Sequence, residues 1–260
     1  MTTETLLRLG SFLAILAVMG AAETLRPRRG LSTGKGRRWF ANLSVAVLAS
    51  VLTRVLIPIL PAGVAAYCRT HGLGLLHLVS PPPVLAWIVS VLVLDMAIYW
   101  QHVLFHRRQL LWRVHRMHHA DLDIDASTGI RFHPIEIVLS MLIKLAVVLV
   151  LGPPAGAVIL FEILLNGCAV FNHANVRIPL HVDRVLRLFL VTPDQHRVHH
   201  STNMREANMN FGFNFPWWDR MFRTYKPQPD LGHERMRIGL NIFRDREYGG
   251  LIRMLTIPFL

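Results

Sequence analysis

Long apolar runs separated by basic or proline-rich segments dominate the chain. Each is close to the roughly 20 residues that a helix needs to cross a bilayer core of about 30 Å. They cover residues 6–22, 42–60, 84–105, 135–151 and 155–171. Pro81-Pro82-Pro83 precedes the third run, and Gly152-Pro153-Pro154 predicts a tight turn between the last two. The pattern predicts a helical protein with four to five transmembrane helices.

Basic residues predict how these helices are oriented. The first run is followed, not preceded, by a basic segment that ends at Arg38, so we expect a retained helix and not a secretory signal. Cytoplasmic loops carry an excess of Lys and Arg. The segment after the first run, residues 107–131 and the chain beyond Phe171 are therefore expected in the cytoplasm. Residues 62–80 are expected outside, as an interfacial segment.

The composition supports a membrane protein. Hydrophobic residues make up 52% of the chain and charged residues 17%, against roughly 25% in an ordinary soluble domain. The net charge of +12 is not accompanied by a nucleic-acid-binding motif, so no nucleic-acid partner is expected. Two cysteines, Cys68 and Cys168, are too few for a disulfide framework or an iron–sulfur site.

Charged residues inside apolar runs predict ion pairs, because an unpaired charge in the bilayer is costly. Lys144 and Glu162 lie at similar depth on either side of the predicted turn, so we expect them to pair and to lock that hairpin. Arg54 and Asp95 are at comparable depth on the second and third runs and form a second, weaker candidate pair.

Histidine is over-represented, with 14 residues, and most of them are clustered. On a helix, positions i, i+3 and i+4 share one face, so such imidazoles can bind one metal ion. Imidazole suits zinc, copper, iron and nickel. Eight ligands exceed the four that one tetrahedral zinc takes, which predicts two metal ions. The three clusters are His102 with His106, His115 with His118 and His119, and His196 with His199 and His200.

The remaining histidines divide into two sets. His173, at the inner end of the fifth run, is expected to be a ninth ligand. His133, before Pro134, is either an additional ligand or partner of a ligand, or a hydrogen-bonded boundary residue. Four others lack the position or the spacing of ligands: His71, His77, His181 and His233.

Residues 84–225 resemble the fatty acid hydroxylase / sterol desaturase superfamily of membrane di-iron oxygenases. The motifs that carry the resemblance are Asp95-x-x-x-Tyr99-Trp100-x-His102-x-x-x-His106, Leu111-Trp112-Arg113-x-His115-x-x-His118-His119, Arg131-Phe132-His133-Pro134-x-Glu136, Phe171-Asn172-His173-Ala174-Asn175, Thr192-Pro193-x-x-His196-x-x-His199-His200-Ser201, Asn210-Phe211-Gly212 and Trp217-Trp218-Asp219-Arg220-x-Phe222. One departure is Arg223 in Phe222-Arg223-Thr224-Tyr225, where such proteins often have glycine; it affects a turn and not the metal site.

The resemblance implies an all-α integral membrane protein whose cytoplasmic, histidine-rich helical cap holds two iron ions, with zinc as a substituted metal. It implies use of O2 as co-substrate and of electrons from a separate donor, of ferredoxin or cytochrome type. The reaction would hydroxylate or desaturate an unactivated C–H position of a lipid: an acyl chain, a sterol-like or ether lipid, or a carotenoid. The domains expected are 1–83 for the N-terminal helices, 84–225 for catalysis and 226–260 for a tail packed on the cap or membrane surface.

Several polar residues are candidates for supporting roles. Histidine ligands usually donate their second N–H to a carboxylate or carbonyl. Asp194 and Asp219 are the preferred carboxylates, ahead of Asp121, Asp123 and Asp125. Asp95 and Tyr99 share a helical face with His102 and His106 and are candidates for a substrate channel. The pair Trp217-Trp218 is expected to be an aromatic anchor at the membrane interface.

Two other classes of protein remain as alternatives. A metal transporter would need histidines near the middle of the membrane, whereas these crowd one boundary. A zinc-dependent membrane hydrolase would use fewer histidines and a neighbouring glutamate, as in H-E-x-x-H, which is absent from the sequence.

Overall fold

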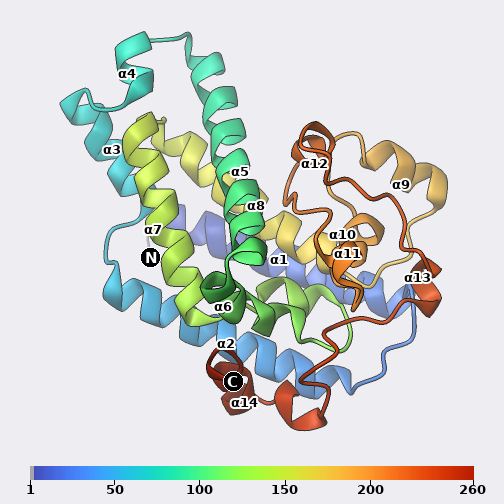
Figure 1. Cartoon of the computed structure of the whole chain (residues 1–260). Helices are drawn as coiled ribbons and strands as arrows, with labels where there is room; N and C mark the ends of the chain where they lie inside the picture. Colours follow the sequence, from blue (N-terminus) through green and yellow to red (C-terminus); the bar gives the residue numbers. More distant parts are fainter. Residues whose placement is uncertain (1–2) are drawn as a thin grey trace.

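The computed structural model describes residues 3–260, which form helices and loops without a β-strand (Figure 1). Five helices are long and apolar enough to cross a membrane. They are α1 (Thr3–Leu25), α2 (Lys35–Leu56), α5 (Pro83–Arg107), α7 (Pro134–Leu151) and α8 (Ala155–His173). The predicted all-α fold and its apolar helices are thus confirmed. α2 begins earlier than expected because the basic segment Lys35–Arg38 already forms its first turn.

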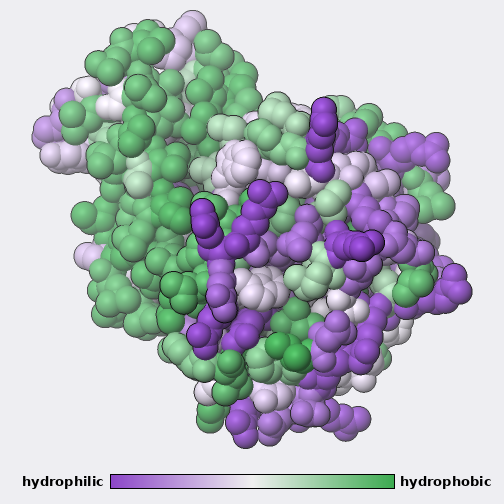
Figure 2. All heavy atoms as spheres, in the orientation of Figure 1, coloured by the Kyte–Doolittle hydropathy of each residue, from purple (hydrophilic) through white to green (hydrophobic). Residues whose placement is uncertain are grey.

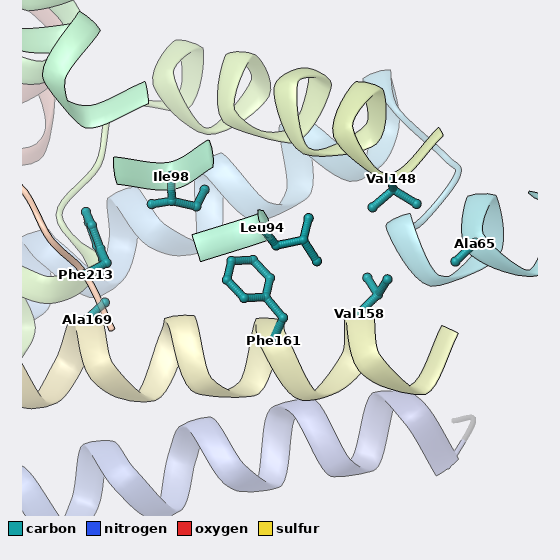
Figure 3. Close-up of a cluster of buried hydrophobic side chains, with 8 residues drawn as sticks. All are labelled: Ala65, Leu94, Ile98, Val148, Val158, Phe161, Ala169 and Phe213. Carbon is teal, nitrogen blue, oxygen red and sulfur yellow. The ribbon is translucent and has the colours of Figure 1, made fainter. Parts of the chain in front are cut away.

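The long helices pack in pairs around one apolar core. α1 packs against α8, α2 against α7, and α5 against both α7 and α8. Leu94 and Ile98 of α5 meet Phe161 of α8, and Val148 closes the layer from α7 (Figure 3). The outer faces of these helices expose leucine, valine and isoleucine side chains, as expected where lipid replaces water. The chain is a multi-pass membrane protein.

The segment expected outside folds into two short helices, α3 (Pro61–His71) and α4 (Leu75–Val79). α3 packs against α7 and α8, at the end where these two helices are joined. Gly74 and Gly152, both with positive φ, touch backbone to backbone: a Cβ on Gly74 would lie 2.4 Å from the amide nitrogen of Gly152. The segment therefore lies at the end of the bundle away from the histidines (Figure 1).

One of the two ion pairs predicted between the long helices is present in the structure. Lys144 donates to Glu162 over 2.9 Å, which confirms the predicted pair. Glu162 also pairs with Arg8 of α1 over 2.6 Å, a partner that the sequence analysis missed. The predicted pair of Arg54 with Asp95 is wrong. Arg54 is exposed, and Asp95 turns inward to accept a hydrogen bond from the indole N–H of Trp218 over 2.7 Å.

Short helices build a polar cap at the other end of the bundle, and Figure 2 shows the change from the apolar part to this hydrophilic part. They are α6 (Gln109–His119), the 3-10 helix η1 (Ala126–Ile130), α9 (Leu180–Leu186), α10 (Pro193–His199), α11 (Met204–Ala207), α12 (Trp217–Met221) and α13 (Gly232–Arg235). The chain ends with η2 (Arg246–Gly249), α14 (Leu251–Thr256) and η3 (Ile257–Phe259). Met254 and Ile257 are fully buried against α2 and α6, so this last segment is part of the packed structure.

Ion pairs fasten the cap to the long helices. Arg38 of α2 is buried and donates to both oxygens of Asp121 over 2.9 and 2.8 Å. Arg28, in the loop after α1, pairs with Asp194 of α10 over 3.1 Å. The basic loop between α1 and α2 therefore lies at the same end of the molecule as the histidine clusters.

Candidate metal centre

Nine histidines converge between the bundle and the cap. Eight of them lie on four helices, and His200 directly follows α10. α5 and α8 bring side chains from the bundle, and α6 and α10 bring them from the cap. Within each group the candidate ligand atoms all lie within 4.8 Å of one another. The first group is His102, His106, His115, His119 and His199, and the second is His118, His173, His196 and His200. These are the nine residues predicted as ligands.

The spacing of the histidines explains how they divide. On α6, His115 and His119 are one turn apart and join the first group, whereas His118 points to the second. The two groups adjoin, because the rings of His119 and His200 stack across them with centroids 4.6 Å apart. The helix α6 thus supplies ligands to both groups, and this arrangement would place two metal ions next to each other.

Burial favours the neutral form of several imidazoles in the cap. All nine are buried except His106, which is partly exposed. In the cap, removal from water lowers the pKa of His199 to about 3. It also lowers the pKa of His118, His119 and His200 well below the usual value, and neighbouring imidazoles add to the effect. A neutral ring offers the lone pair that a metal ion needs.

Hydrogen bonds fix which ring nitrogen carries that lone pair. The Nδ1 atom of His102 lies 2.8 Å from the Phe211 carbonyl, and that of His173 lies 2.6 Å from the Ala169 carbonyl. A carbonyl can only accept, so each Nδ1 carries the proton. Equivalent carbonyl partners serve His118 and His199, at Arg131 over 3.2 Å and at Met209 over 2.8 Å. The lone pairs are therefore on Nε2.

These Nε2 atoms point at one another at short range. The separation is 3.1 Å between His118 and His173, and 3.1 Å between His173 and His196. His118 and His173 both carry their lone pair on Nε2, and two lone pairs at that distance repel unless both atoms bind a cation. The Nε2 atoms of His199 and His200 are also buried, without a hydrogen-bond partner among residues 3–260. The donor set fits transition-metal ions, and because it holds imidazoles only it suits iron, zinc, copper or nickel.

The other histidines lie outside both groups. His133 accepts from the Ile135 amide at Nδ1, and its Nε2 lies 3.3 Å from the Leu255 carbonyl, so it is a hydrogen-bonded boundary residue. His233 contacts Gln228 over 2.8 Å. The structure therefore does not bring His133 to the candidate metal ions.

The carboxylate that touches a candidate ligand is Glu136, 2.7 Å from Nδ1 of His115, and not one of the predicted aspartates. Asp194 pairs with Arg28 and Arg197. Asp219 accepts from the Phe211 and Gly212 amides, so it acts on the loop that holds His102 and not on a ligand. The other three, Asp121, Asp123 and Asp125, bind Arg38 and the residues Ser32, Thr33 and Ser127.

Glu136 was present in the sequence as the last residue of Arg131-Phe132-His133-Pro134-x-Glu136. Its place in the first turn of α7, three residues after His133, was the available signal. It was missed because nothing in the sequence shows that α7 starts beside α6.

The candidate channel residues of α5 contact the cap, to which the tryptophan pair belongs. Tyr99 is buried, and its hydroxyl lies 2.9 Å from that of Thr224. Trp218 is buried against Asp95, so it joins the cap to α5 and is not an interfacial anchor as expected. Trp217 is partly exposed and donates to the Leu188 carbonyl. The channel role of Asp95 and Tyr99 stays a prediction.

The fold and the two histidine groups define a helical membrane protein with a buried imidazole cluster that could hold metal ions. The chain belongs to the fatty acid hydroxylase family, which matches residues 87–224 and therefore includes all nine histidines. No solved structure matches the chain.

Proteins similar in sequence to this chain include enzymes named for reactions on lipids. An alkylglycerol monooxygenase from Danio rerio is 31% identical over 150 residues, which is 55% of this chain and 31% of the relative. An ornithine lipid hydroxylase from Rhizobium tropici is 29% identical over 148 residues, 55% of this chain and 42% of the relative. A very-long-chain aldehyde decarbonylase from Oryza sativa is 24% identical over 210 residues, 76% of this chain and 30% of the relative. The matches thus span less than half of each relative.

Proposed function

We propose that the chain is a membrane-bound oxygenase that holds two iron ions and hydroxylates or desaturates a lipid at an unactivated C–H position, using O2 and electrons from a separate donor. The observation that carries the proposal is the set of Nε2 atoms that face one another at 3.1 Å in a buried pocket. Membership of the fatty acid hydroxylase family supports iron over the other metals that imidazole suits.

When bound, iron supplies the activation of O2 and the one-electron chemistry that side chains lack. The nine imidazoles would be its donors, the first group for one ion and the second for the other. Hydrogen bonds from Nδ1–H to backbone carbonyls hold the rings of His102, His118 and His173 in the tautomer whose Nε2 can bind a metal ion. Burial of these rings keeps water out of the pocket, which protects a reactive centre from side reactions.

Three further features of the proposal concern the surroundings of the site. The substrate is a lipid, in keeping with the alkylglycerol and ornithine lipid named for two relatives, and it approaches along α5 past Asp95 and Tyr99. The histidine-bearing end faces the cytoplasm, because the basic loop between α1 and α2 docks there. Residues 84–225 form the catalytic domain, with 1–83 and 226–260 as its supports.

The direct test is metal analysis of the purified protein combined with a lipid assay. We expect about two iron ions per chain and a product that forms only with O2 and a reductant. Mass spectrometry of lipids from cells with and without the gene would show a gain of one oxygen or a loss of two hydrogens. Zinc at one ion per chain with O2-independent product formation would contradict the proposal.

The ligand assignment predicts the effect of single substitutions. His118→Ala and His199→Ala each remove one donor, one from each group, and are expected to lower turnover at least about 100-fold and to lower the iron content. His71→Ala is the matched control, because His71 lies exposed in α3, at the far end of the bundle. Near-normal activity of either variant would show that the assigned residue is not a ligand.

A further inference from the structure

A short segment of the cap, residues 209–212, carries the carbonyl partners of two candidate ligands of the first group. The Phe211 carbonyl accepts from Nδ1 of His102 over 2.8 Å, and the Met209 carbonyl accepts from Nδ1 of His199 over 2.8 Å. The Phe211 ring also lies edge-on to both imidazoles, with centroids 5.5 Å apart. The position of this segment therefore sets the orientation of both rings.

The carboxylate of Asp219 holds this segment. Asp219 is fully buried, and it accepts from the Phe211 amide at Oδ1 over 2.8 Å and from the Gly212 amide at Oδ2 over 2.9 Å. Glycine allows this approach, because a Cβ on Gly212 would lie 2.8 Å from the carboxylate. Thr224 donates to Oδ1 over 2.7 Å. The two amides and this hydroxyl are thus partners of a buried negative charge.

One of the two amides belongs to the same peptide group that His102 binds. The Gly212 N–H and the Phe211 carbonyl are the two ends of a single peptide group, so the carboxylate and the imidazole bind its opposite ends. Hydrogen bonds in such a chain polarise one another. Negative charge at the N–H end makes the carbonyl oxygen a stronger acceptor, and a stronger acceptor at Nδ1–H makes the ring a better metal donor.

The other three carbonyl-bound ligands are not connected to a carboxylate in this way. In the peptide group that binds His199, the N–H donates to the Thr224 carbonyl over 2.7 Å. In the one that binds His118, the N–H donates to the Ile130 carbonyl over 3.1 Å. The peptide group that binds His173 lies inside α8, where backbone carbonyls are the partners. The carboxylate connection is therefore specific to one ligand of the four.

We propose that Asp219 is a positioning residue for His102, which acts through this peptide group and makes His102 a stronger donor to the metal ion of the first group. The inference rests on the proposed function, because it requires that the group holds a metal ion. His115 of the same group has a direct carboxylate partner, Glu136. Among residues 3–260, no hydrogen bond joins a carboxylate to the second group, so the two ions would be held with unequal affinity.

The carboxylate must be ionised for this effect. Burial raises the pKa of Asp219 to about 6, and the hydrogen bonds from Thr224 and from the two amides oppose a larger rise. A carboxyl group with this pKa is almost fully ionised at pH 8. Asp219→Asn at pH 8 therefore removes a negative charge with little change in side-chain volume.

Asp95→Asn is the matched control. Asp95 is also buried and also accepts from the cap, from the Trp218 indole N–H over 2.7 Å and from the Asn214 amide over 3.4 Å. The carbonyl at the other end of that peptide group accepts from an asparagine and not from a histidine. Loss of this carboxylate should thus weaken the contact between cap and bundle without changing a candidate ligand.

Nuclear magnetic resonance of the zinc-loaded protein with 15N-labelled histidine, in detergent at pH 8, reports on each Nδ1–H proton. A stronger hydrogen bond moves this proton to a higher chemical shift. We expect Asp219→Asn to lower the chemical shift for His102 and to leave that of His199 in place, although both rings bind the same segment. Asp95→Asn should change neither signal.

A third variant shifts the same signal in the opposite direction. Thr224→Val keeps the charge of Asp219 but withdraws one donor from it, so the Gly212 amide receives a larger share of that charge. The chemical shift of the His102 Nδ1–H proton should therefore rise. If Asp219→Asn does not fold, this variant decides the matter, and an unchanged or lowered shift overturns the inference.

Metal affinity is the second readout, measured with Fe(II) and a colorimetric chelator in the absence of O2. Asp219→Asn should weaken the binding of one of the two ions by about 3–10-fold, less than the loss of a direct partner causes, and Asp95→Asn should weaken neither. The inference is overturned if the His102 signal does not move, or if the His102 and His199 signals move together, since the carboxylate would then only hold the segment in place. Wild-type protein that binds neither zinc nor iron would refute the proposed function as well, and this is seen before any variant is compared.

Discussion

At the level of single residues, backbone carbonyls orient four of the candidate ligands. The backbone carbonyls of Phe211, Arg131, Ala169 and Met209 each accept a hydrogen bond from an imidazole Nδ1–H. A carbonyl partner fixes the tautomer without adding charge to the pocket. Among the contacts within residues 3–260, His115 differs from the other eight in having a carboxylate partner, Glu136, so its ring should be the most strongly donating of the nine.

This difference predicts a graded effect at Glu136. Glu136→Gln keeps an acceptor for Nδ1 of His115 but removes the charge, so we expect metal affinity to fall by about 10–100-fold with little loss of stability. Competition with a chelator of known affinity measures the change. Glu162→Gln is the control, since this carboxylate binds Lys144 and Arg8 and should affect stability but not metal affinity. Equal metal affinity in wild type and Glu136→Gln would contradict the role assigned to the carboxylate.

At the scale of elements, close contacts join helices that are distant in the sequence. The contact of Gly74 with Gly152 ties the turn between α3 and α4 to the α7–α8 turn. It depends on two features of glycine, a missing Cβ and a positive φ. Neither turn could approach the other so closely with a larger residue, so these glycines position the far end of the bundle.

Two alanine substitutions separate these features. Gly74→Ala should lower the free energy of unfolding by about 2–4 kcal/mol, because its Cβ would overlap the Gly152 backbone and φ is +98°. Gly72→Ala also has a positive φ, +63°, but open space at Cβ, so we expect only about 1 kcal/mol. Denaturant or thermal unfolding in detergent measures both. A similar loss for the two variants would rule out a packing role for Gly74.

At the scale of the whole molecule, the metal site is also the joint between bundle and cap. His102 and His173 come from the bundle and His118, His196 and His199 from the cap, so ions bound among them would cross-link the two parts. Without ions, the facing lone pairs would push them apart. Metal content should therefore control the stability of the cap as well as activity.

Chelation tests this coupling. Removing metal is expected to lower the unfolding midpoint by roughly 10 °C, and Fe(II) added without O2 should restore it. The double variant His118→Ala/His199→Ala should unfold at a similar temperature with and without the chelator. An unchanged midpoint for the wild-type protein, with complete metal loss shown by elemental analysis, would mean that the ions do not join bundle to cap.

Features that depend on local pattern could be predicted from the amino-acid sequence. Apolar runs of bilayer length predicted the five long helices, and the spacing of His115, His118 and His119 predicted that one helix would present a metal-binding face. The pair Lys144–Glu162 was also predictable, because a short turn fixes the register of an antiparallel hairpin.

Contacts between residues far apart in the sequence became visible in the folded structure. It placed Glu136 and not Asp194 or Asp219 beside a candidate ligand, turned Asp95 toward Trp218 and away from Arg54, and divided the nine histidines into groups of five and four. These contacts depend on how α5, α6, α7 and α10 pack, and the identity of a polar residue does not specify which of several possible partners the packing will bring to it.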